Sequence, residues 1–305
     1  MDRNRTVSDY YRDELMRVSR VSPLPGGSAL LLTTKQKAAL VDSGFAFCAD
    51  EMLENIKAVL GDRQLDYILL THSHYDHASG SGRCRLAYKN LKVAASEYAA
   101  KILSKPSALS VIGELNASAA GHYGARFSGD ELGNLSVDVV VREGEEIDLG
   151  DVSLRVLEAP GHTKCCLSFY IPQNKTLISC ETLGASADGF SIAPGFLVSY
   201  ISSVSYIERL LRLDIENLFI PHFGPLRGKD CAEFIKRALK AAESLKDLIV
   251  SDHLQGKTEE EIIEHYREVY YNGELEDIQP LRAFYMNAEH LVPMVIKEMT
   301  APAER

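Results

Sequence analysis

The sequence predicts an α/β protein in which two β-sheets pack face to face with helices outside them, followed by an all-helical C-terminal end. Three observations predict this class. Short β-rich runs alternate with helical stretches in the first half, and segments of period two follow at residues 136–162. After residue 225 the apolar residues recur only at helical spacing. We therefore expect a core at residues 1–225 and a helical extension at residues 226–305 that docks on it.

The first elements are two strands, a helix and a buried strand. Residues 29–32 and 38–41 are apolar runs joined by a polar turn, which predicts a strand pair. Residues 49–61 carry their apolar side chains at helical spacing and end at a glycine. The apolar run at residues 65–70 predicts a buried strand. The segment THSHYDHASG at residues 71–80 then lies in a loop at the carboxyl end of that strand, where open α/β sheets place their sites.

The middle of the chain predicts more strands than helices. The expected elements are helices within 97–126, an antiparallel meander at 136–162, strands at 165–171 and 175–181, a helix at 196–213 and a strand at 216–225. Two of the expected strands in this region lead into a histidine, as the strand before residues 71–80 also does. This arrangement indicates two sheets packed face to face with helices outside them.

The C-terminal end predicts helices alone. Asp230 with Glu233, and Thr258 with Glu261, have the spacing of a capping box, which marks two helix starts. A last helix is expected from about Ile278, and a proline within it predicts a kink.

Composition and charge exclude several classes of protein. The formal net charge of -10 argues against a nucleic-acid partner, because such binding depends on clustered Lys and Arg. No apolar run approaches the ~18 residues of a membrane span, and the N-terminus lacks the apolar core of a secretory signal. The six cysteines form no paired spacing typical of zinc sites. We expect a cytoplasmic protein with free thiols that binds neither nucleic acid nor membrane.

The segment at residues 71–80 contains three of the nine histidines. Neighbouring imidazoles compete for protonation and each buried ring nitrogen needs a partner, which a shared metal ion would supply. His72 and His74 flank one residue, so both side chains project to the same side of an extended loop and can share a metal. Asp76 and His77 follow a turn and could serve a second metal nearby.

This motif and three later segments resemble the metallo-β-lactamase superfamily. The superfamily pattern continues with Gly-His after a strand, a bridging aspartate at a strand end and a final histidine. Here the matching segments are APGHT with His162, ISCETLG with Glu181 and IPHFGP with His222, and LVDSG matches an early Asp-x-Gly with Asp42. The similarity covers about residues 15–225. It implies an αββα sandwich with the metals at one edge, here with a C-terminal all-helical extension.

The resemblance also implies a ligand set for two divalent metal ions, Zn or Fe, with Mn as a further choice. It assigns His72, His74 and His162 to one metal, Asp76, His77 and His222 to the other, and Glu181 to the bridge between them. Asp76 would in addition act as the catalytic residue that orients a hydroxide and passes a proton to the leaving group.

Two departures from the pattern leave alternatives open. The superfamily usually has Gly-Asp where this chain has Cys180 and Glu181, and the added methylene moves the carboxylate by ~1.5 Å. Glu181 could bridge both metals or bind one. Cys180 could replace it as a ligand, but successive strand residues face opposite sides, so we expect Cys180 to pack in the core. Asp42 is expected to hold the motif loop by hydrogen bonds rather than to bind a metal.

A two-metal site of this kind supports hydrolysis, because the ions lower the pKa of a shared water and polarise the scissile bond. Thiolates and alkoxides need less acid assistance to leave than amines. We therefore expect a small-molecule thioester, ester or lactone as the substrate. The alternatives are a metal-stabilised regulatory or binding protein with little turnover, and a phosphodiesterase.

The length and helical end resemble thioesterase-like members of the superfamily such as glyoxalase II and, in layout, the quinolone-signal response thioesterase. In both, C-terminal helices close the site, so residues 226–305 would cover the active site here. Tyr75, Phe190, Phe196 and Tyr200 are the expected substrate contacts. An apolar surface of the helical end could also support a homodimer.

Overall fold

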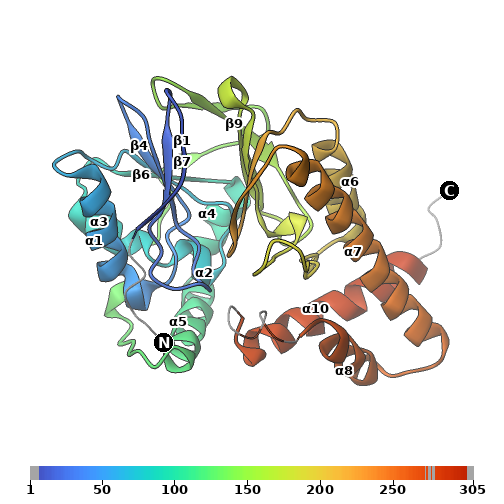
Figure 1. Ribbon diagram of the computed structural model, residues 1–305. Coiled ribbons are helices and arrows are strands. Elements are labelled where there is room, and N and C mark those ends of the chain that lie inside the picture. Colours follow the sequence, from blue (N-terminus) through green and yellow to red (C-terminus); the bar gives the residue numbers. More distant parts are fainter. Residues whose placement is uncertain (1–6, 272, 274–275, 277–278, 301–305) are drawn as a thin grey trace. The chain divides into compact units, whose positions relative to one another are not determined.

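The computed structural model describes residues 7–271, 273, 276 and 279–300 (Figure 1). The chain divides into two compact units, Met1–Glu158 with Leu167–Ile178 and Ala159–Cys166 with Ser179–Arg305. Neither unit is one continuous segment, because the chain passes between them three times.

A seven-stranded sheet forms the first part of the first unit, in the order β1-β2-β3-β4-β5-β6-β7. Its strands are β1 Ser8–Arg12, β2 Arg17–Arg20, β3 Leu30–Thr33, β4 Ala38–Val41, β5 Tyr67–Leu69, β6 Lys92–Ala95 and β7 Val139–Val140. Strands β1 to β4 pair antiparallel, and β4 to β7 pair parallel. The carboxyl ends of β4 and β5 therefore lie at the same edge of the sheet, where a site is expected.

The apolar patterns of the first unit form the predicted elements. The two strands and the polar turn before the first helix are confirmed as β3 and β4, and every residue of β4 is buried. Helix α1 Ala49–Leu60 buries Met52 and Ile56 on one face. It ends before Gly61, whose φ of 60° favours glycine because a side chain there would be strained. Helices α1 and α3 lie beside the first sheet (Figure 1).

Short helical segments connect the remaining strands of the first unit. These are η1 Ala46–Cys48, α2 Tyr75–Ala78, α3 Ser81–Ala87, α4 Glu97–Leu103, α5 Pro106–His122, η2 Asp130–Leu132 and η3 Pro172–Asn174. The helices predicted within residues 97–126 are confirmed as α4 and α5, with Pro106 at the first position of α5, where its missing N–H costs nothing.

Four antiparallel strands of the second sheet also belong to the first unit. They are β8 Glu146–Asp148, β9 Ser153–Glu158, β10 Leu167–Ile171 and β11 Thr176–Ile178, in the order β11-β10-β9-β8. Hydrogen bonds tie them to the first sheet: Thr34 Oγ1 donates to the carbonyl of Leu149 at 2.7 Å, and Leu167 N donates to the carbonyl of Thr71 at 2.7 Å. The predicted α/β class with two sheets is confirmed.

The predicted strand at 175–181 is shorter than expected, because β11 ends at Ile178. Glu181 is instead the first residue of a 3-10 helix, η4 Glu181–Leu183. Alternation of side chains between two faces therefore does not apply to Cys180 and Glu181, since it requires a continuous strand.

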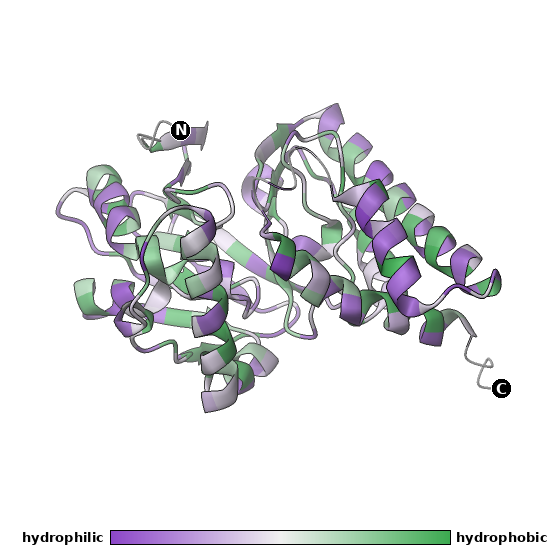
Figure 2. Ribbon diagram, turned by 90° about the horizontal axis from the view of Figure 1, so that it is seen from below, coloured by the Kyte–Doolittle hydropathy of each residue, from purple (hydrophilic) through white to green (hydrophobic). Residues whose placement is uncertain are grey.

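The second unit contains a strand pair and four helices among its described residues. Its elements are η4, α6 Tyr200–Leu210, β12 Asn217–Ile220, β13 Gly224–Arg227, α7 Lys229–Leu254, α8 Glu259–Tyr270 and α10 Leu281–Thr300. Figure 2 shows these helices with hydrophilic and hydrophobic residues alternating along the ribbon, as expected of helices with one buried face. The buried faces meet in a cluster that includes Phe196, Leu245, Ile262, Phe284 and Leu291. The predicted helical C-terminal region is confirmed.

One of the two predicted capping boxes is confirmed. Thr258 accepts from the backbone N–H of Glu261, and the Glu261 carboxylate accepts from that of Thr258. The box predicted at Asp230 is wrong, because α7 begins after Gly228 and has no side-chain cap. Ile278 lies outside the described residues, and α10 continues through Pro293.

Residues 179–225, which the sequence analysis assigns to the core, belong to the same compact unit as the helical extension. The contacts explain this grouping. Phe196 is 1% exposed in the helical cluster, and Glu298 of α10 accepts from the backbone N–H groups of Tyr200 and Ile201 at 2.9 and 3.2 Å. The carboxylate thereby occupies the N-terminus of α6, where a negative charge is stabilising.

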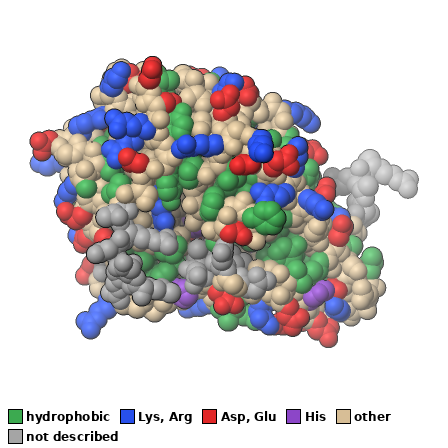
Figure 3. Space-filling view, in the orientation of Figure 1, with side chains coloured by type: hydrophobic (Ala, Val, Ile, Leu, Met, Phe, Trp, Pro, Cys, Tyr) green, Lys and Arg blue, Asp and Glu red, His purple; other side chains and the backbone are tan. Residues whose placement is uncertain are grey.

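Among the described residues, no helix combines the length and apolar character that crossing a bilayer requires. The face drawn in Figure 3 carries acidic and basic side chains interspersed with hydrophobic ones.

Candidate metal centre

The histidine motif lies in a loop that follows β5 and leads into the short helix α2. Backbone hydrogen bonds hold this motif loop from two sides: Ser28 N donates to the carbonyl of Asp76 at 3.1 Å, and Ser43 N donates to that of His77 at 2.6 Å. His74 has extended backbone angles immediately before α2. The prediction that the motif sits at the carboxyl end of a buried strand is confirmed.

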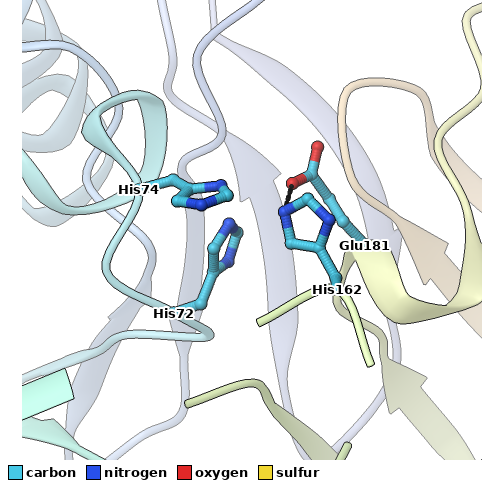
Figure 4. Close-up of side chains that lie close together, drawn as sticks. All are labelled: His72, His74, His162 and Glu181. Atoms are coloured by element: carbon cyan, nitrogen blue, oxygen red, sulfur yellow. Dashed lines mark ion pairs between the residues drawn. The ribbon is translucent and has the colours of Figure 1, made fainter. Parts of the chain in front are cut away.

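The motif loop gathers four donor side chains within the first unit. The ring centroids of His72 and His74 lie 4.6 Å apart, and those of His72 and His77 lie 4.2 Å apart. Asp76 Oδ2 lies 3.5 Å from His77 Nε2. Figure 4 shows His72 and His74 as neighbours on this loop. His72 and His77 are fully buried, and buried imidazoles in such proximity are the donor type that zinc, iron and manganese sites use.

Asp42 orients two of these imidazoles. Its Oδ2 lies 2.7 Å from His77 Nδ1, and its Oδ1 accepts from the backbone N–H of Thr71 at 2.8 Å. The Thr71 hydroxyl contacts Asp42 and lies 3.0 Å from His72 Nδ1. An Nδ1–H that donates to the carboxylate leaves Nε2 as the nitrogen of His77 that can accept a metal ion. These distances agree with the supporting role expected for Asp42.

Asp42→Asn is expected to lower metal affinity about 10- to 100-fold, the usual cost of losing an outer partner of a metal-binding histidine. The amide oxygen of asparagine can still accept a hydrogen bond from Thr71, but the NH2 group cannot accept one from His77 Nδ1. The φ of 58° at this position is tolerated by asparagine, so the backbone should not move. Competition with a chromophoric chelator measures the affinity.

The matched control is Asp50→Asn, which removes an exposed carboxylate that pairs with Arg83 on the same unit. It should bind metal as tightly as the parent. Equal affinities for Asp42→Asn and the parent would contradict the orienting role.

The second unit gathers two histidines around one carboxylate. Glu181 Oε2 lies 2.7 Å from His162 Nε2, and Glu181 Oε1 lies 2.9 Å from His222 Nε2. Figure 4 shows the ion pair between His162 and Glu181. His222 has a φ of 65°, which is uncommon outside glycine and typical of functional positions. The carboxylate therefore presents one oxygen to each histidine.

Backbone groups fix His162 and Glu181 relative to each other. His162 Nδ1 contacts the carbonyl of Gly195 at 2.6 Å, and the backbone N–H of His162 donates to Thr182 Oγ1 at 3.2 Å. A Cβ added to Gly195 would lie 2.3 Å from the carbonyl oxygen of Glu181. Burial opposes protonation of His162, but Glu181 and the Gly195 carbonyl outweigh it, so the pKa of His162 is raised.

Cys180, the alternative ligand to Glu181, lies in the core. Cys180 is fully buried, and burial together with the neighbouring Cys180 raises the pKa of the Cys166 thiol well above its ordinary value. These observations favour packing for Cys180. The six cysteines, all of them among the described residues, form no disulfide.

The predicted substrate contacts differ in how deeply their side chains are buried. Tyr75 lies partly buried against Phe45, with ring centroids 5.7 Å apart, and Tyr200 packs edge to face on Phe196 at 5.4 Å. Their contact with a substrate stays a prediction. Phe196 requires a correction, because a side chain that is 1% exposed in the helical cluster offers no surface to a substrate.

Sequence reasoning missed Gly195 and Thr182. Gly195 belongs to a Pro-Gly pair, which signals only a turn. Its closeness to Glu181 depends on the tertiary structure, so no local pattern could reveal it.

An α/β fold with two sheets and two groups of His, Asp and Glu donors defines a class of metal-binding proteins. A family model described as "Metallo-beta-lactamase superfamily" matches residues 23–222. The chain belongs to the metallo-β-lactamase superfamily, and the predicted αββα class with a C-terminal helical region is confirmed.

Curated relatives are similar over part of their length. Glyoxylase B2 of Dictyostelium discoideum is 31% identical over 132 residues, covering 43% of this chain and 39% of the relative. Hydroxyacylglutathione hydrolase of Francisella tularensis subsp. novicida is 29% identical over 147 residues, covering 47% of this chain and 45% of the relative. The chain thus spans less than half the length of these two relatives.

Solved structures share the fold over nearly the whole chain. A metallo-beta-lactamase family protein from Thermus thermophilus is similar with a TM-score of 0.63 and 19% identity, covering 96% of this chain and 92% of that one. An archaeal superfamily protein from Sulfolobus tokodaii gives a TM-score of 0.59 and 18% identity, covering 95% of this chain and 97% of that one.

Proposed function

We propose that the protein is a metal-dependent hydrolase of small-molecule thioesters, esters or lactones. The observation that carries this proposal is the placement of Glu181, which offers one carboxylate oxygen to His162 and the other to His222. Membership of the superfamily and relatives named as a glyoxylase and a hydroxyacylglutathione hydrolase support it.

The donor chemistry fits two divalent ions. Imidazole nitrogens and carboxylate oxygens suit Zn, Fe and Mn, and the Nδ1 contacts of His72, His77 and His162 make Nε2 the coordinating atom. As the resemblance implies, His72, His74 and His162 would hold one ion, Asp76, His77 and His222 would hold the other, and Glu181 would serve both. The longer side chain of Glu181 can do so because its two oxygens already diverge toward two histidines.

Bound ions would supply a hydroxide at neutral pH and polarise the reacting carbonyl. The chain's own contribution is to hold the ligands and to move a proton. Asp76 is 16% exposed in its side chain and lies beside His77, so its carboxylate can orient a nucleophile and pass a proton to the leaving group. A single carboxylate of this kind suits thiolate and alkoxide leaving groups, which need less acid assistance than amines.

Metal-loaded protein is expected to hydrolyse members of a panel of thioesters, esters and lactones, and to leave the matched amides almost untouched. Treatment with a chelator should remove the activity, and readdition of Zn²⁺, Fe²⁺ or Mn²⁺ should restore it. Release of thiol or acid, followed by absorbance, measures the turnover.

Negligible turnover across the panel by protein that binds metal tightly would contradict the hydrolase and favour a regulatory or binding role. Turnover confined to bis-aryl phosphodiesters would instead favour a phosphodiesterase.

A further inference from the structure

The loop between η4 and α6 contacts the metal-binding side of the second unit at both of its ends. We define the selectivity loop as residues 184–195. At its start Gly184 N donates to the carbonyl of Glu181 at 2.9 Å, and at its end the Gly195 carbonyl contacts His162 Nδ1 at 2.6 Å. Ala185 and Ala193 pair through two backbone hydrogen bonds of 3.0 and 2.9 Å, which close the loop between these ends.

The middle of the selectivity loop packs beside the third proposed ligand of this unit. Gly189 has a φ of 73°, and a Cβ added there would lie 2.5 Å from the ring of Phe223. Phe223 directly follows His222, whose Nε2 lies 2.9 Å from Glu181. One loop therefore contacts or adjoins His162, Glu181 and His222.

Hydrogen bonds make the tip of the loop rigid. Asp188 accepts from the backbone N–H groups of Phe190 and Ser191, both at 2.7 Å, and from the hydroxyl of Ser191 at 2.8 Å. Arg237 of α7 donates to the carbonyls of Phe190 and Gly189 at 2.9 and 3.1 Å. Its guanidinium carbon lies 4.7 Å from the centroid of the Phe190 ring.

The ring of Phe190 is nevertheless 73% exposed. A single exposed apolar side chain is ordinary on a protein surface. Here Arg237 supports the ring, and the loop that carries it contacts Glu181 and His162 at its two ends. The exposed part of the ring is thus an apolar surface on a loop whose two ends contact Glu181 and His162.

We propose that Phe190 binds the apolar or aromatic acyl group of the substrate, so that the enzyme selects carboxylic thioesters or esters with such an acyl group over acetyl esters. This inference rests on the proposed hydrolase function. The reacting carbonyl has to lie at the ligands, and the acyl group attached to it can reach the adjoining loop. Arg237 acts through Phe190 as a positioning residue, because its donors are already used by the loop carbonyls.

The chain contains no tryptophan, so Phe190→Trp introduces a single fluorescent reporter at the tip of the loop. In metal-loaded protein, octanoate should shift the emission to shorter wavelength in a saturable manner, and acetate should not. The control Leu254→Trp places the reporter on α7 at a side chain that is 77% exposed, and its emission should stay constant. Both substitutions replace exposed side chains, so folding is expected to be retained.

Three results would overturn the inference: no shift with octanoate, equal shifts at both reporter positions, or a shift with octanethiol but not with octanoate. The last result would assign Phe190 to the leaving group. The titration measures binding without turnover, so a protein that hydrolyses nothing can still show the octanoate shift. Failure of the proposed hydrolase and failure of this inference are thereby distinguished.

Turnover provides a second test. Phe190→Ala should lower the ratio of kcat/KM for octanoyl over acetyl thioester about tenfold, the size of effect that a lost apolar contact produces. Arg237→Gln should lower the ratio in the same direction, and Leu254→Ala should leave it unchanged. An unchanged ratio in Phe190→Ala would overturn the inference while leaving the hydrolase assignment intact.

Discussion

Replacing His74 with alanine is expected to abolish metal-dependent hydrolysis. His74 lies 4.6 Å from His72 between ring centroids, and both belong to a loop that backbone hydrogen bonds fix at Asp76 and His77. Loss of a direct ligand should exceed the ~10- to 100-fold penalty of an outer partner, so turnover should fall more than about 100-fold. Initial rates on the best thioester of the panel, at saturating metal, give the measurement.

His122→Ala is the matched control, because His122 is an exposed histidine at the end of α5 in the same unit. It should retain the parent's rate. Undiminished turnover by His74→Ala would refute the assignment of the motif to the reaction.

Gly195→Ala is expected to disrupt the second donor group without touching any donor atom. The added Cβ would lie 2.3 Å from the carbonyl oxygen of Glu181, so the backbone there must shift, and it would contact His162 Nδ1 at 3.4 Å. Overpacking of this kind typically costs about 1–3 kcal/mol. Metal affinity should fall at least about tenfold, because the donors lose the geometry that Gly195 enforces.

Thermal unfolding and chelator competition measure the two effects separately. Gly121→Ala is the control, since nothing lies within 4 Å of a Cβ added there in α5. It should be neutral or stabilise by about 0.5–1 kcal/mol, because alanine is preferred to glycine in a helix. Parental metal affinity in Gly195→Ala would contradict the close packing of Gly195 on Glu181.

Local sequence patterns predict the helices and strands whose burial or capping depends on residues within the element itself. The run at residues 38–41 is apolar throughout and forms the fully buried strand β4. Thr258 and Glu261 cap α8 reciprocally, as their spacing predicts. The position of the histidine motif after β5 follows from an apolar run that ends at a polar cluster.

Tertiary contacts decide what the sequence could not show. The 3-10 helix that begins at Glu181 replaces the expected strand end, and this turn lets the carboxylate face His162 and His222. The resemblance suggests a substrate contact at Phe196, but the helical cluster buries its side chain. The motif predicts a supporting role for Asp42, whereas the distances that join it to His77 and Thr71 come from the fold.

The central claim of the proposed function is that the protein binds two metal ions. Metal content per chain, measured by mass spectrometry on protein purified without chelators, tests it most directly. We predict about two equivalents, as in two-metal hydrolases. One equivalent or none would contradict the claim and would mean that the glutamate at position 181 does not bridge a second ion.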